Sequence, residues 1–304
     1  MHFKRWITAI VALPLVVLLI YKGGSILFAI FICMVCTLAL AEYFCIALLQ
    51  AESSKQEAER SKVEAERSKV EAESKKQKAE NRSAFSFQLC PFSFQLSAFI
   101  IGPMIIWAAY RNSFDIILGL IILNLILSGL ISLRCFKTNP LVAEIVAKQV
   151  LGIIYIPLFF SCMVLIRNDV DGIAWIFFLL TLVFAGDTGA FYVGRIFGQH
   201  KLCPAVSPGK TIEGAIGGLA ATLGAGFIFI NCFLKSLSLG PSMLFFLSIG
   251  VVGQVGDLFE SELKRYADVK DSGSILPGHG GILDRIDALL FAAPVAYFFK
   301  EYIF

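Results

Sequence analysis

A segment near the carboxyl end of the chain, residues 261–287, holds nine charged side chains and one of the three histidines, yet long apolar stretches lie on both sides of it. Asp257 lies at the end of the apolar run before this segment, and Asp284 begins the run after it. A carboxylate at the centre of a bilayer costs about 2.5 kcal/mol or more. Acidic residues at the edges of apolar runs therefore indicate a functional site.

The spacing of these residues predicts two polar helix faces. On a helix, Asp257, Ser261 and Lys264 share one face, while Asp284 and Asp287 share another. Two acidic faces at neighbouring helix ends can hold a divalent cation, and magnesium usually binds through one or two carboxylates together with substrate phosphates. We therefore expect Mg²⁺ at Asp257 and Asp284. Interhelical salt bridges, for example between Asp257 and Lys264, are the alternative.

The loop inside this segment is rich in glycine. Glycine permits positive φ angles and a close approach of the backbone, which suits a loop that wraps phosphate with its amides. The same residues could simply turn the chain. The loop contains Gly273, Pro277, Gly278, His279, Gly280 and Gly281.

A second polar cluster covers residues 186–214. Ser207 as a cap, with Pro208 at the first helical position, predicts a helix whose free amides favour phosphate, with Lys210 beside it. Asp187 lies late in an apolar run, where a carboxylate needs a metal or a basic partner. This cluster is therefore a second candidate for binding phosphate.

The composition shows which elements must position these residues. The chain has 304 residues, of which 57% are hydrophobic and 16% charged, with a mean hydropathy of +0.77. A bilayer core of roughly 30 Å needs about 20 apolar residues per helix. We expect an all-α, polytopic integral membrane protein with about nine transmembrane helices. The predicted spans are 6–21, 26–49, 96–110, 114–133, 149–166, 172–194, 212–234, 241–263 and 283–303.

The distribution of positive charge predicts the orientation. With the amino terminus in the cytoplasm, the inner segments hold 21 of the 26 Lys and Arg residues and the outer segments hold 5. Cytoplasmic loops retain positive charge, so both polar clusters are expected on the cytoplasmic side of the cell membrane. The net charge of +3 is small and interspersed, which argues against nucleic-acid binding.

The eight cysteines are scattered along the chain and lie mostly inside apolar runs. We expect them to act as small apolar packing residues. A disulfide framework is not expected from this distribution.

A charged insert separates the first two predicted spans from the rest. The sequence EAERSKV at 57–63 is repeated at 64–70, and its acidic and basic residues suit a solvated helix with ion pairs at i,i+3. The insert is either a spacer or an arm that docks a partner or lipid headgroups. We divide the chain into membrane helices at 1–50, a cytoplasmic insert at 51–83 and a membrane-embedded catalytic domain at 84–304.

The residues of both clusters resemble the signature of the phosphatidate cytidylyltransferases, the CDP-diacylglycerol synthase family. That signature reads S-x-L-K-R, K-D-x-G, L-P-G-H-G-G and D-R-x-D, and residues 261–287 match every fixed position. The elements at 187–190, 194–198 and 207–214 are also similar. The matches cover roughly the last 120 residues, whereas Glu42-Tyr43-Phe44 is a weak match and the insert departs from the pattern.

The resemblance implies transfer of CMP from CTP to phosphatidate, with release of pyrophosphate and formation of CDP-diacylglycerol for phospholipid synthesis. It also implies a magnesium ion and a potassium ion around Asp257 and Asp284, and a homodimer. The catalytic residues expected on this basis are Asp257, Asp284, Lys264, Arg265 and His279, with His279 orienting the loop or serving as a general acid. The substrate-binding residues expected are Ser207, Lys210, Ser261, Lys270, Arg285, Asp187 and Asp287.

Two other functions stay open from the sequence. A CTP-dependent lipid-alcohol kinase would use the same nucleotide but is not expected to show the complete signature. A cation-coupled membrane transporter would use Asp187, Asp257 and Asp284 as an ion path. A transporter would need sealed vesicles, whereas an enzyme would work in detergent.

Overall fold

The structure is a computed structural model that describes residues 14–67, 77–137, 141–273, 275 and 280–304. Within these ranges, side chains are described for residues 14–47 and from Ser93 onward. The chain is almost entirely helical, and a two-stranded antiparallel sheet is its only sheet in the described ranges. The predicted all-α fold class is therefore confirmed.

Seven of the described helical segments are long and apolar enough to cross a membrane. Together they make this a multi-pass membrane protein. The apolar parts of these segments are Gly24–Ala47 in α2 (Gly24–Arg67), Ser93–Tyr110 in α3 (Gln77–Tyr110), α4 (Phe114–Cys135), Val142–Asn168, α7 (Gly172–Phe197), α8 (Ile212–Cys232) and α9 (Leu239–Tyr266).

The other two predicted spans are less simple. The ninth forms α10 (Leu283–Tyr302), which carries charged residues at both ends and is not among the seven. The first lies partly outside the described residues, and 14–22 of it is helical. The count of nine therefore stays a prediction.

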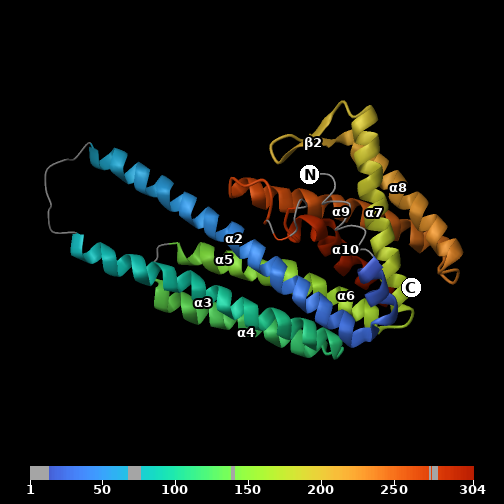
Figure 1. The fold of residues 1–304 in the computed structure, drawn as a ribbon, viewed down its shortest axis with the longest axis horizontal. Coiled ribbons are helices and arrows are strands. Elements are labelled where there is room, and N and C mark those ends of the chain that lie inside the picture. The colour runs from blue at the N-terminus through green and yellow to red at the C-terminus, as the bar shows by residue number, and fades with distance from the viewer. Residues whose placement is uncertain (1–13, 68–76, 138–140, 274, 276–279) are drawn as a thin grey trace.

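Helix α3 packs against α4 and against α2, from which it diverges toward the carboxyl end of α2 (Figure 1). A buried polar network joins α3, α4 and α5 (Val142–Ile153). The Gln149 side chain donates to Asn124 Oδ1 at 2.6 Å and to Ser97 Oγ at 3.2 Å, and it accepts from Asn124 Nδ2 and Ser128 Oγ. Each hydrogen-bonding position of the Gln149 amide is used, so the network stabilises the packing of these helices.

The fifth span is not a uniform α-helix. Between α5 and α6 (Phe159–Asn168) lies a π-helical segment, Ile154–Leu158, that contains Pro157. Proline has no backbone N–H to donate, and π-bulges accommodate such a break inside a helix. The segment turns Tyr155 into the protein, where its ring packs against Phe259 and Phe291.

The carboxyl-terminal helices approach one another through small residues. A Cβ atom added at Gly189 of α7 would lie 2.4 Å from Cβ of Ala221, and one added at Gly217 of α8 would lie 2.4 Å from Cβ of Val193. In a membrane, small residues let helix backbones come into van der Waals contact. This close packing fixes the hairpin β1 (Lys201–Cys203) and β2 (Ser207–Thr211), which joins α7 to α8.

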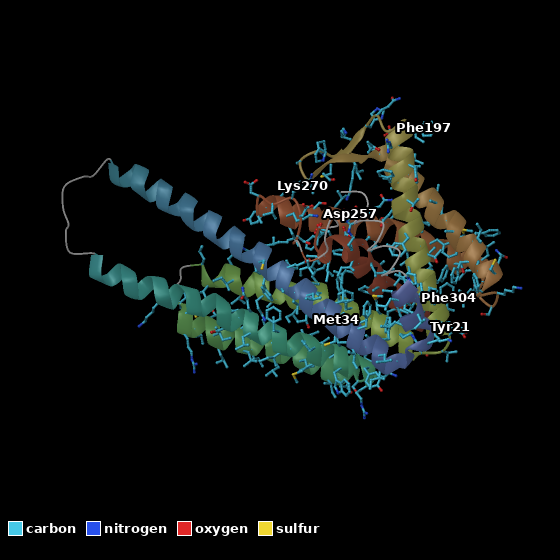
Figure 2. All side chains as sticks on the ribbon, in the orientation of Figure 1. Tyr21, Met34, Phe197, Asp257, Lys270 and Phe304 are labelled. Carbon is cyan, nitrogen blue, oxygen red and sulfur yellow. The ribbon has the colours of Figure 1, made fainter. Side chains whose placement is uncertain are left out.

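The loops alternate between two ends of the helix bundle. At one end, the Asn168 side chain donates to the carbonyl of Tyr110 at 3.0 Å, and Lys300 pairs with Asp169. The hairpin and the segment after α9 lie at the opposite end, as the labelled positions of Phe197 and Lys270 against Tyr21 and Phe304 show (Figure 2). Which end faces the cytoplasm stays a prediction.

The charged insert continues α2 as a helix to Arg67, and α3 begins at Gln77. The two helices extend beyond the rest of the molecule (Figure 1). The helical interpretation of the repeat is therefore confirmed for 51–67. The predicted ion pairs lie outside the residues whose side chains are described.

Six cysteines carry free thiols, but Cys135 is disulfide-bonded. The expectation that the cysteines act only as packing residues is therefore wrong for Cys135. Sequence spacing alone could not show this, because disulfide formation depends on the spatial approach of two Cβ atoms.

Candidate active site

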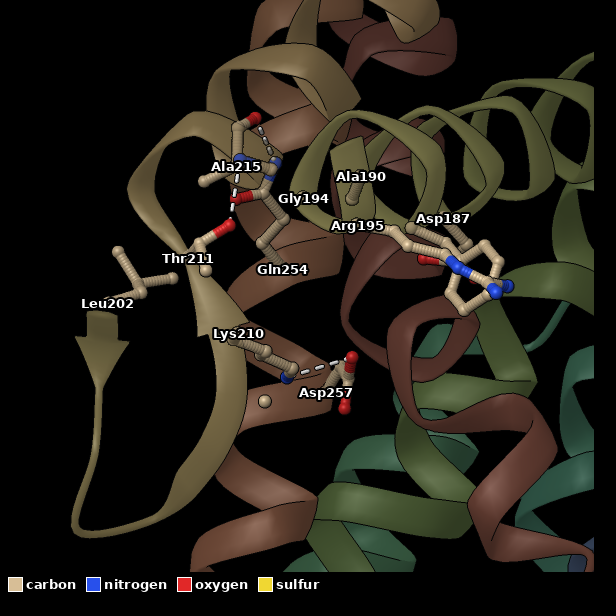
Figure 3. Close-up of a pocket in the computed structure, with 13 residues that line it drawn as sticks. Asp187, Ala190, Gly194, Arg195, Leu202, Lys210, Thr211, Ala215, Gln254 and Asp257 are labelled. Atoms are coloured by element: carbon tan, nitrogen blue, oxygen red, sulfur yellow. Dashed lines mark hydrogen bonds and ion pairs between the residues drawn. The ribbon is translucent and has the colours of Figure 1, made fainter. Parts of the chain in front are cut away.

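A pocket of about 340 Å³ lies between α7, the β1–β2 hairpin and the neighbouring parts of α8 and α9 (Figure 3). Its charged lining residues are Asp187 and Arg195 from α7, Lys210 from β2 and Asp257 from α9. Both polar clusters of the sequence therefore contribute to one region of the protein. Residues 70 positions apart, Asp187 and Asp257, line the same space.

The residues before α8 form a hairpin rather than the first turn of a helix. The prediction that a helix begins at Ser207-Pro208 is wrong, because Ser207 pairs with Cys203 in the antiparallel ladder. Helix α8 begins at Ile212, and Thr211 is its N-cap, with Oγ1 accepting from the Gly214 N–H at 3.1 Å. Lys210 consequently extends from a strand, where neighbouring side chains alternate in direction.

Lys210 reaches from the hairpin to α9. Its Nζ atom lies 2.8 Å from Oδ2 of Asp257, and both side chains are partly exposed, by 25% and 38%. The alternative pairing of Asp257 with Lys264 does not occur in the structure, since Lys264 has other acidic partners. Asp257 and Lys210 both line the pocket, although the Nζ atom of Lys210 is itself buried.

The Asp257 carboxylate of this ion pair belongs to a set of three carboxylates from three helices. Asp187 of α7, Asp257 of α9 and Asp287 of α10 lie close enough for their charges to interact with one another. Like charges at short range oppose ionisation unless a cation compensates them. Lys210 interacts with Asp187 as well as with Asp257. The oxygen-rich set fits a hard divalent cation.

In the part of the chain that the structure describes, no three His, Cys, Asp or Glu side chains come close enough to bind one ion by themselves. That agrees with the usual mode of magnesium binding, in which one or two carboxylates act together with water and substrate phosphate oxygens. The acidic set therefore suits an ion that arrives with a nucleotide.

Asp284 has a different environment from Asp257. Its Oδ1 atom accepts from Lys264 Nζ at 2.6 Å, and its Oδ2 atom accepts from the backbone N–H groups of Ser272 at 3.0 Å and Gly281 at 2.8 Å. Lys264 Nζ also lies 2.5 Å from Oε2 of the fully buried Glu260. Asp284 therefore holds the glycine-rich loop against α9 in this structure.

Asp257 and Asp284 pair with different lysines, Lys210 and Lys264. The carboxylates whose charges interact with Asp257 are Asp187 and Asp287. The assignment of a metal to Asp257 and Asp284 stays a prediction. The geometry adds Asp187 and Asp287 as candidate ligands.

Glu42 of α2, which the sequence analysis named only within a weak family match, also belongs to this region. Its side chain is only 4% exposed, and its two oxygens accept from the Ser272 hydroxyl at 3.0 Å and from the backbone N–H groups of Ile282 at 2.9 Å and Leu283 at 2.8 Å. The first amides of a helix lack partners within it, and a carboxylate near them is favoured by the helix dipole. Glu42 therefore caps α10 from another helix.

The glycines of the loop fit this carboxylate. A Cβ atom added at Gly281 would lie 2.4 Å from Glu42 Oε2, and one added at Gly273 would lie 2.7 Å from Glu42 Oε1. Gly280 has a φ of +80°, which other residues rarely adopt. At Gly273 and Gly281 the glycines permit a close approach to Glu42. A single acidic residue inside the apolar run 26–49 was the available signal.

The remaining predicted residues lie around this core. Arg265 donates through Nε to the carbonyl of Val206 at 3.2 Å, which ties the end of α9 to the hairpin. Lys270 and Arg285 are exposed, and Ser261 is half-buried on α9. His279 lies outside the described residues. Its expected role as a loop-orienting residue or general acid stays a prediction.

Residues 76–303 match the model of the Cytidylyltransferase family. The chain belongs to this family. It is similar to the phosphatidate cytidylyltransferase of Bacillus subtilis (strain 168), with 46% identity over 149 residues, which are 49% of this chain and 55% of that protein. It is also similar to the phosphatidate cytidylyltransferase of Haemophilus influenzae, with 41% identity over 141 residues, or 45% of this chain and 49% of that protein.

The matched region spans about half the length of these curated relatives. The family match is longer, and it begins one residue before α3. Family membership therefore covers both the acidic cluster and the polar network of α3 to α5.

Proposed function

We propose that this protein transfers CMP from CTP to phosphatidate and produces CDP-diacylglycerol and pyrophosphate. A phosphate oxygen of phosphatidate would form a bond to the α-phosphorus of CTP, and the bond from that phosphorus to the pyrophosphate oxygen would break. The observation that supports this most is the pocket where Lys210 meets the acidic set of Asp187, Asp257 and Asp287, in a chain whose relatives are named phosphatidate cytidylyltransferase.

The reaction asks for alignment and charge neutralisation rather than a protein nucleophile, because a phosphate monoester is itself nucleophilic. Lys210 is suited to this task because Asp257 holds its ammonium group at the pocket. The ammonium could exchange this carboxylate for a phosphate oxygen as its ion-pair partner. Arg195 lines the same pocket and can bind phosphate through two N–H groups. Lys264, already bound to Asp284 and Glu260, would keep the loop and α9 in register.

The cofactor belongs to this proposal as well. Asp257 would hold magnesium together with Asp187 or Asp287, with Asp284 as the other candidate, and potassium is proposed from the family resemblance alone. When bound, magnesium would offset the charge of the phosphates and of the leaving pyrophosphate. The carboxylates themselves would orient the ion and set its distance from Lys210.

The site would face the cytoplasm, where the nucleotide is found. The hairpin, the end of α9 and the start of α10 lie at one end of the bundle (Figure 2), and by the charge count these are inner segments. Phosphatidate would reach the site from the bilayer, because the helices around the pocket expose apolar side chains such as Phe191 and Ile216.

The test uses the full chain purified in detergent, with phosphatidate, a lipid alcohol, magnesium and CTP labelled at either the α- or the γ-phosphorus. The proposal expects the α-label in lipid and the γ-label in pyrophosphate. Label from the γ-position in lipid would instead show a lipid-alcohol kinase. Incorporation of neither label, combined with cation movement in sealed vesicles, would show a transporter.

A further inference from the structure

A second pocket, of about 810 Å³, lies at the opposite end of the bundle from the acidic cluster. It is formed where α6 ends, α7 begins and α8 ends, with Tyr21 beside them. Figure 2 places Tyr21 at the far side of the molecule from Asp257. The proposed cytidylyl transfer uses none of the residues that line this pocket.

The pocket contains a buried positive charge with incomplete bonding. Arg167 is only 9% exposed, and its Nη2 atom donates to the carbonyl of Ile20 at 3.2 Å. Its buried Nε–H has no hydrogen-bond partner within the part of the chain that the structure describes. Among the described residues, no carboxylate forms an ion pair with Arg167. Burying a charge and an N–H donor without partners is costly, so the guanidinium points to an anionic group from outside the chain.

The mouth of the pocket carries the opposite charge. Asp169 and Asp171 line it, and both are exposed. The Lys300 ammonium donates a hydrogen bond to Asp169 and lowers the pKa of that carboxyl, so this pair stays ionised and neutralises itself. Asp171 forms no ion pair with the described residues. The site thus presents one buried cation below one exposed anion.

The wall of the pocket is apolar and follows a helix. Ile173, Phe177 and Thr181 of α7 lie at i, i+4 and i+8, which spans about 12 Å along the axis. The Thr181 hydroxyl donates to the carbonyl of Phe177 at 2.7 Å, so its proton is not available to a ligand. Phe229 of α8 and Phe233, which directly follows that helix, form the other side. A groove of this kind suits a hydrocarbon chain.

We propose that this pocket binds a zwitterionic glycerophospholipid as a bound lipid rather than as a substrate. Its phosphate would pair with Arg167, its ammonium would lie toward Asp171, and one acyl chain would follow the groove between α7 and α8. A purely anionic headgroup fits less well, because its second charge would lie near Asp171. The pocket lies at the level of the helix ends, where phospholipid headgroups are found.

The test is native mass spectrometry of the full chain, delipidated in detergent and titrated with phosphatidylethanolamine or phosphatidylglycerol. We expect one tightly retained phosphatidylethanolamine and weaker retention of phosphatidylglycerol. Arg167→Met should weaken phosphatidylethanolamine binding about tenfold. Arg111→Met, which removes an exposed charge at the same end of the bundle, should leave binding unchanged.

Two further variants keep the result decisive if Arg167→Met folds poorly. Ala174→Trp would fill the groove without touching Arg167 and should also weaken binding. Asp171→Asn should reduce the preference for phosphatidylethanolamine over phosphatidylglycerol. Equal retention of both lipids by the unmodified chain, or unchanged binding in Ala174→Trp, would overturn the proposal. Cytidylyl transfer in detergent should persist in Ala174→Trp, so a failure here differs from a failure of the proposed function.

Discussion

Two groups of buried polar side chains lie in the membrane part of this protein, and they differ in how fully they are bonded. Between α3, α4 and α5, the Gln149 amide uses all its hydrogen-bonding positions on Asn124, Ser128 and Ser97. Around the candidate active site, the buried Tyr155 hydroxyl and the Glu260 Oε1 atom have no hydrogen-bond partner. In the described part of the chain, every hydrogen-bonding position of the Gln149 amide has a partner, whereas these atoms near the candidate active site have none.

The difference separates structure from function. A satisfied polar network specifies how helices pack, whereas unsatisfied buried atoms need a ligand, an ion or water to compensate them. Tyr155 lies close enough to Glu260, Asp257 and Asp287 for electrostatic interaction with each. The group that contains Tyr155 and Glu260 therefore adjoins the acidic cluster. Substitutions in this group and in the Gln149 network should have different consequences.

The largest effect is expected for Asp257→Asn. The change removes a charge from the acidic cluster and from the ion pair with Lys210, so CMP transfer should fall by about 100-fold or more. Initial rates of lipid labelling from α-labelled CTP measure this. Asp115→Asn, at an exposed position in the first turn of α4, is the control and should keep its full rate. Normal turnover in Asp257→Asn would exclude Asp257 from the site.

A smaller loss is expected for Glu42→Gln. The amide would present N–H groups where the carboxylate now accepts from Ile282 and Leu283, and each lost bond to a charged acceptor costs about 1.5–3 kcal/mol. We expect turnover to fall about tenfold and thermal unfolding to occur at a lower temperature. Glu301→Gln removes an exposed acid near the carboxyl end of α10, and it should change neither value appreciably. A fully active Glu42→Gln enzyme would show that the cap of α10 does not position the site.

Tyr155→Phe should reduce turnover by only a few fold, because a single neutral hydrogen bond to a bound group contributes about 0.5–1.5 kcal/mol. Its unfolding temperature should stay the same or rise, since the hydroxyl has no partner in the protein. Tyr43→Phe is a matched control with the opposite expectation, because the Tyr43 hydroxyl donates to the Lys148 carbonyl at 2.8 Å. Lower stability with unchanged turnover in Tyr155→Phe would assign that hydroxyl to structure.

The smallest effect on turnover is expected for Gln149→Leu. The substitution leaves the Asn124 amide without its partner, which should lower the free energy of unfolding by about 1 kcal/mol. Unfolding by denaturing detergent measures this change. The double variant Asn124→Leu/Gln149→Leu should recover part of the loss, because both polar partners are then removed. A large fall in turnover for Gln149→Leu would contradict the division between the two groups.

The fold class could be predicted from the sequence because only a few backbone structures can span a bilayer. Runs of about 20 apolar residues can satisfy their backbone only as helices, and the predicted runs coincide closely with the helices from α4 to α9. The sequence also predicted that Asp187, Lys210 and Asp257 lie on the same side, and in the structure these three residues line one pocket. That prediction needed only the count of spans, because successive loops lie on alternate sides of the membrane.

The details that were missed depend on contacts between distant or non-periodic segments. Glu42 accepts from Ile282 across 240 positions, and no local pattern encodes such a pair. The β1–β2 hairpin is too short to show alternating hydrophobicity, so Ser207-Pro208 looked like a helix start. The partner of Asp284 depended on which face of α9 meets α10, and Lys264 lies on that face.

The length of α2 has a consequence for electrostatics. From the end of its apolar part at Ala47, the helix continues for 20 residues to Arg67, or roughly 30 Å along its axis. The Debye length at physiological ionic strength is about 8 Å. A helix that leaves the bilayer along its normal at Ala47 would hold its far end several screening lengths from the surface, so headgroup charges would act only on the first turns of this extension.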